Sequence, residues 1–167
     1  MMKLSMLMNY SSNKVAAIDE VIAYEKAGLD VIWVPEAYSN DAPSAMGYLA
    51  AKTERVQIGS GILPIYTRTP SLLAMTAAGV DELSGGRAIL GLGASGPQVI
   101  EGWHGIAYDR PLARTREVIE ICRMVWRREK LLHEGIYEIP LPKGQGTGLG
   151  KPLKLINHPI REEIRLY

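Results

Sequence analysis

Two side chains that can transfer a proton lie just beyond predicted strands of this sequence. Glu36 follows the apolar run Val31–Val34, and His104 follows a second, glycine-rich strand end. A carboxylate in such a place can act as a general acid or base, or can accept a hydrogen bond from a polar ring edge, and an imidazole can donate to a carbonyl or to an anionic ring oxygen. Each residue also has a structural alternative, because Glu36 can pair with a cation such as Arg68 and His104 can hold its own loop in place.

Glycine is concentrated at two of the predicted strand ends, Gly59–Pro64 and Gly91–Gly96. Glycine at a strand end lets a ligand or another backbone approach closely, as a flat ring across the mouth of a barrel requires; tight packing of strands and helices is the structural alternative. The second segment formally matches the dinucleotide motif G-x-G-x-x-G. However, Pro97 follows it at once, and the acidic residue expected at a strand end ~20 residues further on is absent, so an NAD site of the Rossmann type is disfavoured.

Other kinds of catalytic centre find little support in the sequence. His104, His133 and His158 are far apart and lack metal-ligand spacing. The single cysteine, Cys122, excludes an internal disulfide and a cysteine-based zinc site. There is no G-x-S-x-G elbow to carry a nucleophilic serine. We therefore predict no metal site and no serine-hydrolase chemistry.

Composition narrows the classes of protein further. The 167 residues include 19 Lys and Arg against 18 Asp and Glu, and the net charge of +1 argues against nucleic acid as a partner. A hydrophobic content of 47% excludes a disordered chain. No apolar run approaches the ~18 residues of a membrane span, and Met1–Met8 lacks the cleavage site of a signal peptide. We expect a cytoplasmic protein of about one domain that acts on a small molecule.

The elements that must position the candidate residues alternate between strand and helix. Predicted strands cover Lys3–Tyr10, Val31–Val34, Val56–Leu63 and Ala88–Leu92. Helices with apolar residues at helical spacing are predicted between them and after Pro111. The charged face of that last helix, which includes Arg114, is predicted to be solvated. Apolar strands without alternation at this pitch indicate a parallel sheet with right-handed crossovers, and a closed eight-unit barrel averages ~31 residues per unit.

The pattern changes after the fourth helix. Residues 131–139 are predicted to form a small hairpin and residues 140–152 a Gly/Pro-rich loop, and Ile164–Tyr167 resembles the start of a fifth strand. Two architectures therefore remain open: an open doubly wound sheet, or half of an eight-stranded barrel. In both, ligands bind at the carboxyl ends of the strands, which is where Glu36 and His104 fall.

Six segments, in their order along the chain, resemble the bacterial-luciferase-like (LLM class) oxidoreductases that use flavins or deazaflavins, and specifically the coenzyme F420-dependent branch. These segments are Ala27–Glu36, Ile58–Pro70, Asp81–Arg87, Leu90–Val99, Glu101–Gly105 and Pro111–Glu117. The resemblance implies an α/β fold built from the parallel (β/α) units of a TIM barrel. It also implies that residues 1–167 form the amino-terminal half: the first four units and the start of strand five.

The same resemblance implies where the coenzyme lies. Family members carry a non-prolyl cis peptide at a bulge in the third strand, behind the flavin ring, and here it falls at Gly61–Ile62. Glu36 and His104 take the catalytic positions. The implied coenzyme contacts are Asn9, Gly61, Ile62, Gly93, Ser95, Gly96 and Trp103. Some deazaflavin dehydrogenases place a histidine directly after the acidic residue of the second strand, but this chain has Ala37 there.

The implied reaction is hydride transfer between a deazaflavin (F420) and a small organic substrate. Two alternatives remain: an FMN-dependent monooxygenase of the same fold, and a non-catalytic half-barrel that serves as an interaction module. Family members have roughly twice this length, and barrel phosphate sites usually come from the loops after strands 7 and 8. We therefore expect the truncated chain to be inactive. We also expect it to form a homo-oligomer or to associate through its exposed barrel edges.

Overall fold

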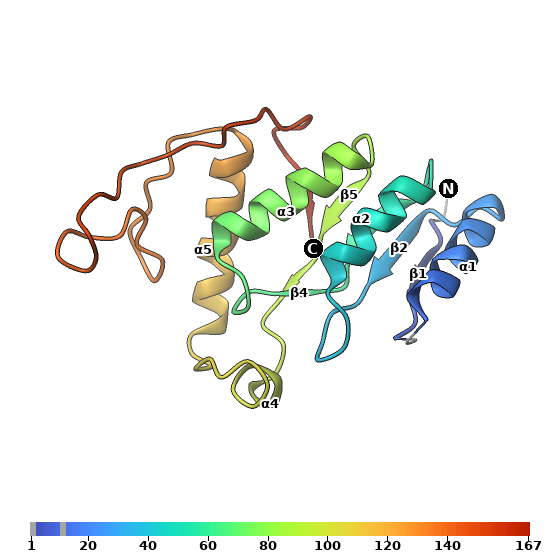
Figure 1. Cartoon of the computed structure of the whole chain (residues 1–167), viewed down its shortest axis with the longest axis horizontal. Coiled ribbons are helices and arrows are strands. Elements are labelled where there is room, and N and C mark those ends of the chain that lie inside the picture. The colour runs from blue at the N-terminus through green and yellow to red at the C-terminus, as the bar shows by residue number, and fades with distance from the viewer. Residues whose placement is uncertain (1–2, 11–12) are drawn as a thin grey trace.

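A computed structural model describes residues 3–10 and 13–167 of the 167-residue chain (Figure 1). In these ranges the strands are β1 (Ser5–Leu7), β2 (Val31–Val34), β3 (Gln57–Ser60), β4 (Leu63–Pro64), β5 (Ala88–Leu90), β6 (Leu92–Gly93) and β7 (Arg165–Leu166). The helices are α1 (Lys14–Lys26), α2 (Ala42–Lys52), α3 (Pro70–Leu83), α4 (Pro97–Ile100) and α5 (Pro111–Trp126). None of the helices in these ranges is long and apolar enough to cross a membrane.

Five strands form one parallel sheet in the order β1-β2-β3-β5-β7, so neighbours in the sheet follow one another along the chain. A doubly wound sheet reverses its strand order at a switch point, whereas the strands of a (β/α)8 barrel progress in chain order. A small two-stranded sheet, β4 with β6, is also parallel and lies just beyond β3 and β5 along the chain. Of the two architectures open from the sequence, the structure shows parallel (β/α) units of the TIM-barrel type.

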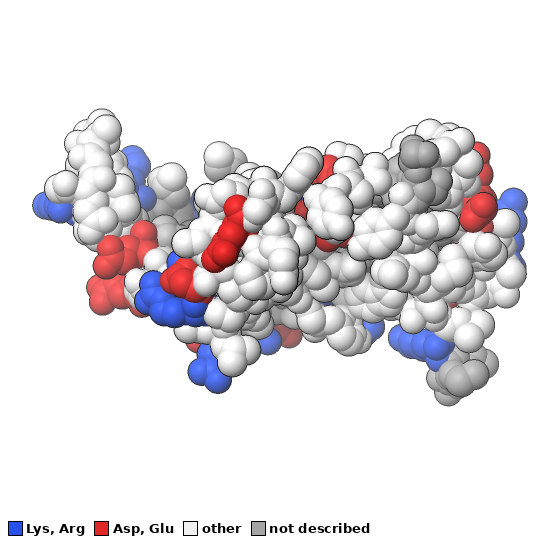
Figure 2. Space-filling model, turned by 90° about the horizontal axis from the view of Figure 1, so that it is seen from below, with Lys and Arg blue, Asp and Glu red and all other residues white. Residues whose placement is uncertain are grey.

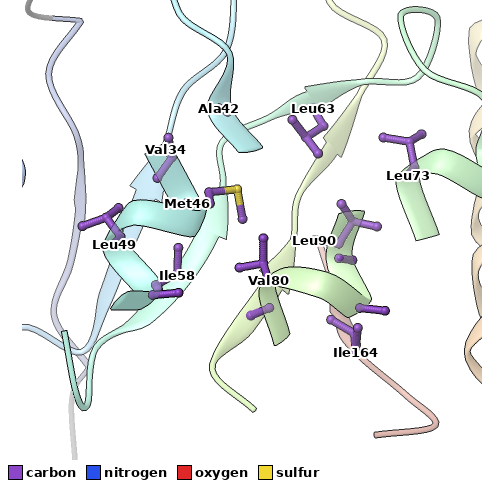
Figure 3. Packing of buried hydrophobic residues seen from close by; sticks show 14 of the residues in the cluster. Val34, Ala42, Met46, Leu49, Ile58, Leu63, Leu73, Val80, Leu90 and Ile164 are labelled. Carbon is purple, nitrogen blue, oxygen red and sulfur yellow. The ribbon is translucent and has the colours of Figure 1, made fainter. Parts of the chain in front are cut away.

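The helices form a layer that also follows chain order. Helix α1 packs on α2, α2 on α3, and α3 on α5 (Figure 1). Strand residues such as Ile32, Ile58 and Leu90 are buried against this layer, and Figure 3 shows Ile58 and Leu90 in one cluster with Met46 and Leu73. This packing orients the strands alike, so their carboxyl ends meet at one edge of the sheet, the lower edge in Figure 1.

The opposite face of the sheet is less covered. Because successive strand residues point to opposite faces, the residues that pair in turn across β1, β2, β3 and β5 occupy one row there: Leu7, Trp33, Gly59 and Ile89. Leu7 is 55% exposed, and the Trp33 ring packs edge-on against Tyr167 with 5.6 Å between ring centroids. In a barrel this row faces the interior.

Two predicted strands are interrupted at glycines. The predicted strand Val56–Leu63 divides into β3 and β4 at Gly61–Ile62, and the predicted strand Ala88–Leu92 divides into β5 and β6 at Gly91. The ends of β3 and β5 approach each other closely at these points, where a Cβ on Gly91 would lie 2.0 Å from the Ser60 carbonyl oxygen. Ser60 Oγ accepts a hydrogen bond from the Gly91 N–H at 2.9 Å and donates to the Gly91 carbonyl at 2.8 Å. The prediction of two continuous strands was therefore wrong at these points.

The first predicted strand, Lys3–Tyr10, is shorter in the structure, where β1 covers Ser5–Leu7. The remaining segments agree with the sequence pattern, with one addition. The predicted hairpin 131–139 is closed by an antiparallel bridge between His133 and Ile139, and residues 140–152 are irregular. The predicted start of a fifth strand at Ile164–Tyr167 is confirmed by β7, which pairs in parallel with β5. The addition is the short helix α4, which the sequence pattern did not predict.

Candidate active site

The candidate site lies at the lower edge in Figure 1, where the segments that follow β1, β2, β4 and β6 emerge from the sheets. Figure 2 views the molecule from below, toward this edge, and shows a mostly uncharged surface with acidic and basic side chains in small separate groups. Ligands of parallel α/β folds bind at this edge. An uncharged surface there is suited to a planar organic ligand.

The carboxylate of Glu36, beyond β2, is held on both of its oxygens. Oε2 accepts hydrogen bonds from the Ala42 N–H at 2.8 Å and from Arg68 Nη2 at 2.9 Å, and Oε1 pairs with Arg68 Nη1. Arg68 also binds Asp41 at 2.7 Å. The side chains of Glu36 and Arg68 are only 9% and 14% exposed, and the hydrogen bond from Arg68 to Glu36 raises the pKa of the guanidinium. The structure thus shows the pairing alternative for Glu36, and its role as an acid or base stays a prediction.

The peptide bond between Gly61 and Ile62 is cis, as the sequence placed it. It lies between β3 and β4, and both residues are half-buried. The Ile62 side chain rests against Gly93, where an added Cβ would lie 2.9 Å from Ile62 Cδ1. A larger residue at position 93 would therefore displace Ile62, so these residues form one packed unit at the centre of the candidate site.

The loop between β6 and α5 carries the other predicted residues. Ser95 is exposed and has a positive φ of 57°, and the backbone N–H groups of Trp103 and His104 both donate to the Val99 carbonyl, at 3.0 and 3.2 Å. The His104 side chain is exposed. The Trp103 ring, on a residue 67% exposed, lies 6.2 Å from the ring of Tyr38 in the segment after β2. The two loops therefore meet through a pair of exposed aromatic rings.

The predicted coenzyme contacts are spread along this edge. Gly96 forms the N-cap of α4, directly after the loop that begins at Gly93. Asn9 follows β1, the outer strand of the sheet, and lines a cavity of about 440 Å³ between β1 and α1. The structure therefore places Asn9 at an open edge of the sheet, whereas Gly61, Ile62 and Gly93 lie over its middle.

The sequence pattern did not single out the side chains that hold the loop between β6 and α5. Arg114, predicted to be solvated, is half-buried, and that prediction was wrong. Its guanidinium lies 5.5 Å from the ring centroids of Tyr66 and Tyr137, because these rings fold over the first turns of α5. The one signal for Tyr66 was its place in the segment Ile58–Pro70.

Fold and site together define the class of TIM-barrel-type enzymes with a site at the carboxyl ends of the strands. Within this class, residues 5–160 match the luciferase-like monooxygenase family, and the chain belongs to this family. It is 47% identical over 146 residues to a putative coenzyme F420-dependent oxidoreductase of Mycobacterium tuberculosis, covering 86% of this chain and 42% of that protein. A 5,10-methylenetetrahydromethanopterin reductase of Archaeoglobus fulgidus is 36% identical, over 66% of this chain and 33% of that protein. The family resemblance drawn from the sequence is confirmed, and the chain spans less than half the length of these relatives.

Solved structures support the same fold. An F420-dependent secondary alcohol dehydrogenase in complex with an F420–acetone adduct superimposes with a TM-score of 0.79 over 99% of this chain and 51% of that chain, at 22% identity. The oxygenating constituent of 3,6-diketocamphane monooxygenase from Pseudomonas putida, in complex with FMN, gives a TM-score of 0.72 over 82% of this chain and 43% of that chain, at 20% identity. At these identities the likeness concerns the fold.

Proposed function

We propose that this chain belongs to an oxidoreductase that transfers a hydride between a deazaflavin (F420) and a small organic substrate. The observation that carries the proposal is the 47% identity, over 86% of the chain, to a relative named as F420-dependent. The geometry supports it, because the cis Gly61–Ile62 unit lies where the family resemblance places the back of the coenzyme ring.

The residues at this edge suit the ring of such a coenzyme better than its phosphate. The side chains of Trp33 and Ile62 pack directly against Gly61 and Gly93, so this part of the edge is a tightly packed apolar surface, and the surrounding surface is largely uncharged. Arg68 is already paired with two carboxylates, so we do not assign it to a phosphate group. Among residues 3–10 and 13–167, no group of three or more His, Cys, Asp and Glu side chains is arranged to hold a metal ion.

The proposed roles follow from where each side chain lies. The coenzyme, when bound, supplies the hydride chemistry, and the protein positions and polarises. Gly61, Ile62 and Gly93 support the ring, and Trp103 covers it from the loop side. His104, exposed on the same loop, donates a proton to the substrate oxygen. Four predicted residues remain: Ser95, Gly96 and Asn9 are proposed as coenzyme contacts, while Glu36, paired with Arg68, anchors the segment after β2.

The first test is a binding titration of the 167-residue chain with F420, followed by the fluorescence of the coenzyme. We expect saturable binding that weakens severalfold in Trp103→Ala. The matched control is Tyr48→Phe on the exposed side of α2, which should bind as the unchanged chain does. A folded chain that binds neither F420 nor FMN would contradict the proposal and favour the interaction module.

An FMN-dependent monooxygenase is the second candidate, because one solved structure of this fold is in complex with FMN. Selectivity of binding decides between the two. Saturable binding of FMN, together with no binding of F420, would select the monooxygenase. A chain that binds F420 and ignores FMN would exclude it.

A further inference from the structure

The segment between β4 and α3, residues 65–69, lies between the two loops that carry the predicted site. It is itself held firmly. The Ile65 N–H donates to the Gly93 carbonyl at 3.0 Å, and Thr67 closes a turn onto the Pro64 carbonyl through its N–H at 3.4 Å and its hydroxyl at 3.2 Å. Thr69 then caps α3 by accepting the Leu72 N–H at 3.2 Å. Because this segment is fixed at both ends, its side chains can hold the neighbouring loops at a defined position.

On one side, Tyr66 reaches the loop between β6 and α5. Its hydroxyl donates to the Asp109 carbonyl at 2.7 Å, and its ring lies 5.2 Å from that of Tyr108. The Tyr108 hydroxyl in turn donates to the Ser95 carbonyl at 3.3 Å, so the start and the end of this loop are joined. Arg114 covers the Tyr66 ring and binds the Asp109 carboxylate at 2.7 Å. Burial raises the pKa of Tyr66, which keeps the hydroxyl protonated as a donor.

On the other side, Arg68 reaches the segment between β2 and α2. It holds the carboxylate of Glu36 in a two-point contact and binds Asp41 at 2.7 Å. Asp41 is the N-cap of α2, and Glu36 accepts the N–H of Ala42. A planar guanidinium in this arrangement sets direction as well as distance, which an ammonium group does not.

We propose that Tyr66 and Arg68 are positioning residues of the candidate active site. Two residues apart on one fixed segment, they set the separation of the loop that carries Ser95, Trp103 and His104 from the segment that carries Glu36 and Tyr38. The 6.2 Å contact between the Tyr38 and Trp103 rings, where the two loops meet, depends on this separation. Each residue acts through the loop that it holds. The functional part of this inference rests on the proposed coenzyme binding.

Hydrogen–deuterium exchange on the full 167-residue chain tests the two contacts separately. Tyr66→Phe removes one hydroxyl, and because a hydrogen bond of this kind contributes ~1 kcal/mol, we expect about fivefold faster exchange across residues 94–108. Arg68→Lys keeps the charge and loses the two-point contact, and should speed exchange across residues 36–44 instead. Tyr48→Phe, on the exposed side of α2, is the matched control and should change neither segment.

The second readout is affinity for F420. Both variants should weaken binding about fivefold, while the midpoint of thermal unfolding falls by only about 2–4 °C. Uniformly faster exchange over α3 and α5, or unchanged exchange in both loops, would overturn the inference. So would local loosening that leaves F420 affinity unchanged. If the unchanged chain does not bind F420, the proposed function fails, and the exchange data alone decide whether Tyr66 and Arg68 hold their loops.

Discussion

Position 91 has room for glycine but not for any larger residue. A Cβ built there would lie 2.0 Å from the carbonyl oxygen of Ser60, which is backbone and has little room to move. The same serine uses its hydroxyl to satisfy both the N–H and the carbonyl of Gly91. The junction of β5 and β6 therefore depends on a glycine for steric reasons.

We expect Gly91→Ala to lower the free energy of unfolding by about 3 kcal/mol, because the overlap forces the two strands apart. Gly47→Ala is the matched control: Gly47 lies inside α2 and an added Cβ meets nothing within 4 Å. That change should raise the free energy of unfolding by about 0.5–1 kcal/mol, since alanine favours a helix. Urea unfolding followed by circular dichroism measures both. Equal effects at the two positions would show that the close approach does not constrain the fold.

At the scale of elements, one buried ion pair attaches the last strand to the rest of the sheet. Asp81, near the end of α3, is 1% exposed and accepts hydrogen bonds from Arg161 Nε at 2.9 Å and from the Ala88 N–H at 3.1 Å. Arg161 Nη2 pairs with the same carboxylate and also donates to the Ala88 carbonyl at 3.0 Å. The pair therefore joins α3, the start of β5 and the segment that leads into β7.

Removing the cation leaves the Asp81 carboxylate buried without its partner. We expect Arg161→Met to lower the free energy of unfolding by about 2–3 kcal/mol, less than the ~3–5 kcal/mol of a fully buried pair because the guanidinium is 34% exposed. The comparison is Arg127→Met, whose partner Glu129 is 43% exposed; it should change stability by less than ~1 kcal/mol. Chemical denaturation of both variants gives the two values, and a small effect at Arg161 would show that water satisfies Asp81 in its place.

For the whole molecule, the decisive feature is a parallel sheet whose outer strands, β1 and β7, have one neighbour each within the described residues. On the face away from the helices, Leu7 is 55% exposed and Tyr167 is 67% exposed. Unpaired strand edges and exposed apolar rows favour association with other chains. We therefore expect the predicted association to occur at the edges formed by β1 and β7 and at the apolar row beside them.

We expect the isolated chain to have a molar mass in solution well above its 18.4 kDa, rising with concentration. Leu7→Glu should lower that mass, because it places a charge in the apolar row. Leu72→Glu, on the exposed side of α3, is the control and should leave the mass unchanged. Light scattering coupled to size-exclusion chromatography makes the measurement. A monomer at every concentration would contradict the prediction.

The sequence by itself determined the class of fold, the family and the order of elements, because these depend on local patterns: apolar strands that start roughly 25 to 32 residues apart, glycines at strand ends and six ordered segments. It also placed the cis bond at Gly61–Ile62, through the family resemblance. It left open whether Glu36 is an acid or an ion-pair partner. That question concerns Arg68, 32 residues away, and such a pairing has no periodic signal along the chain.

Only the tertiary structure decided which strands neighbour one another, and thereby separated a barrel-type sheet from a doubly wound one. It also showed that β3 and β5 end at Gly61 and Gly91, where Ser60 contacts Gly91 across the sheet, a contact that neither strand's own sequence reveals. The roles of Tyr66 and Arg114 emerged in the same way. Tyr66 contacts Asp109 and Arg114, which lie 43 and 48 positions further along the chain. The free energy of these contacts depends on distance in space, so the sequence pattern does not reveal them.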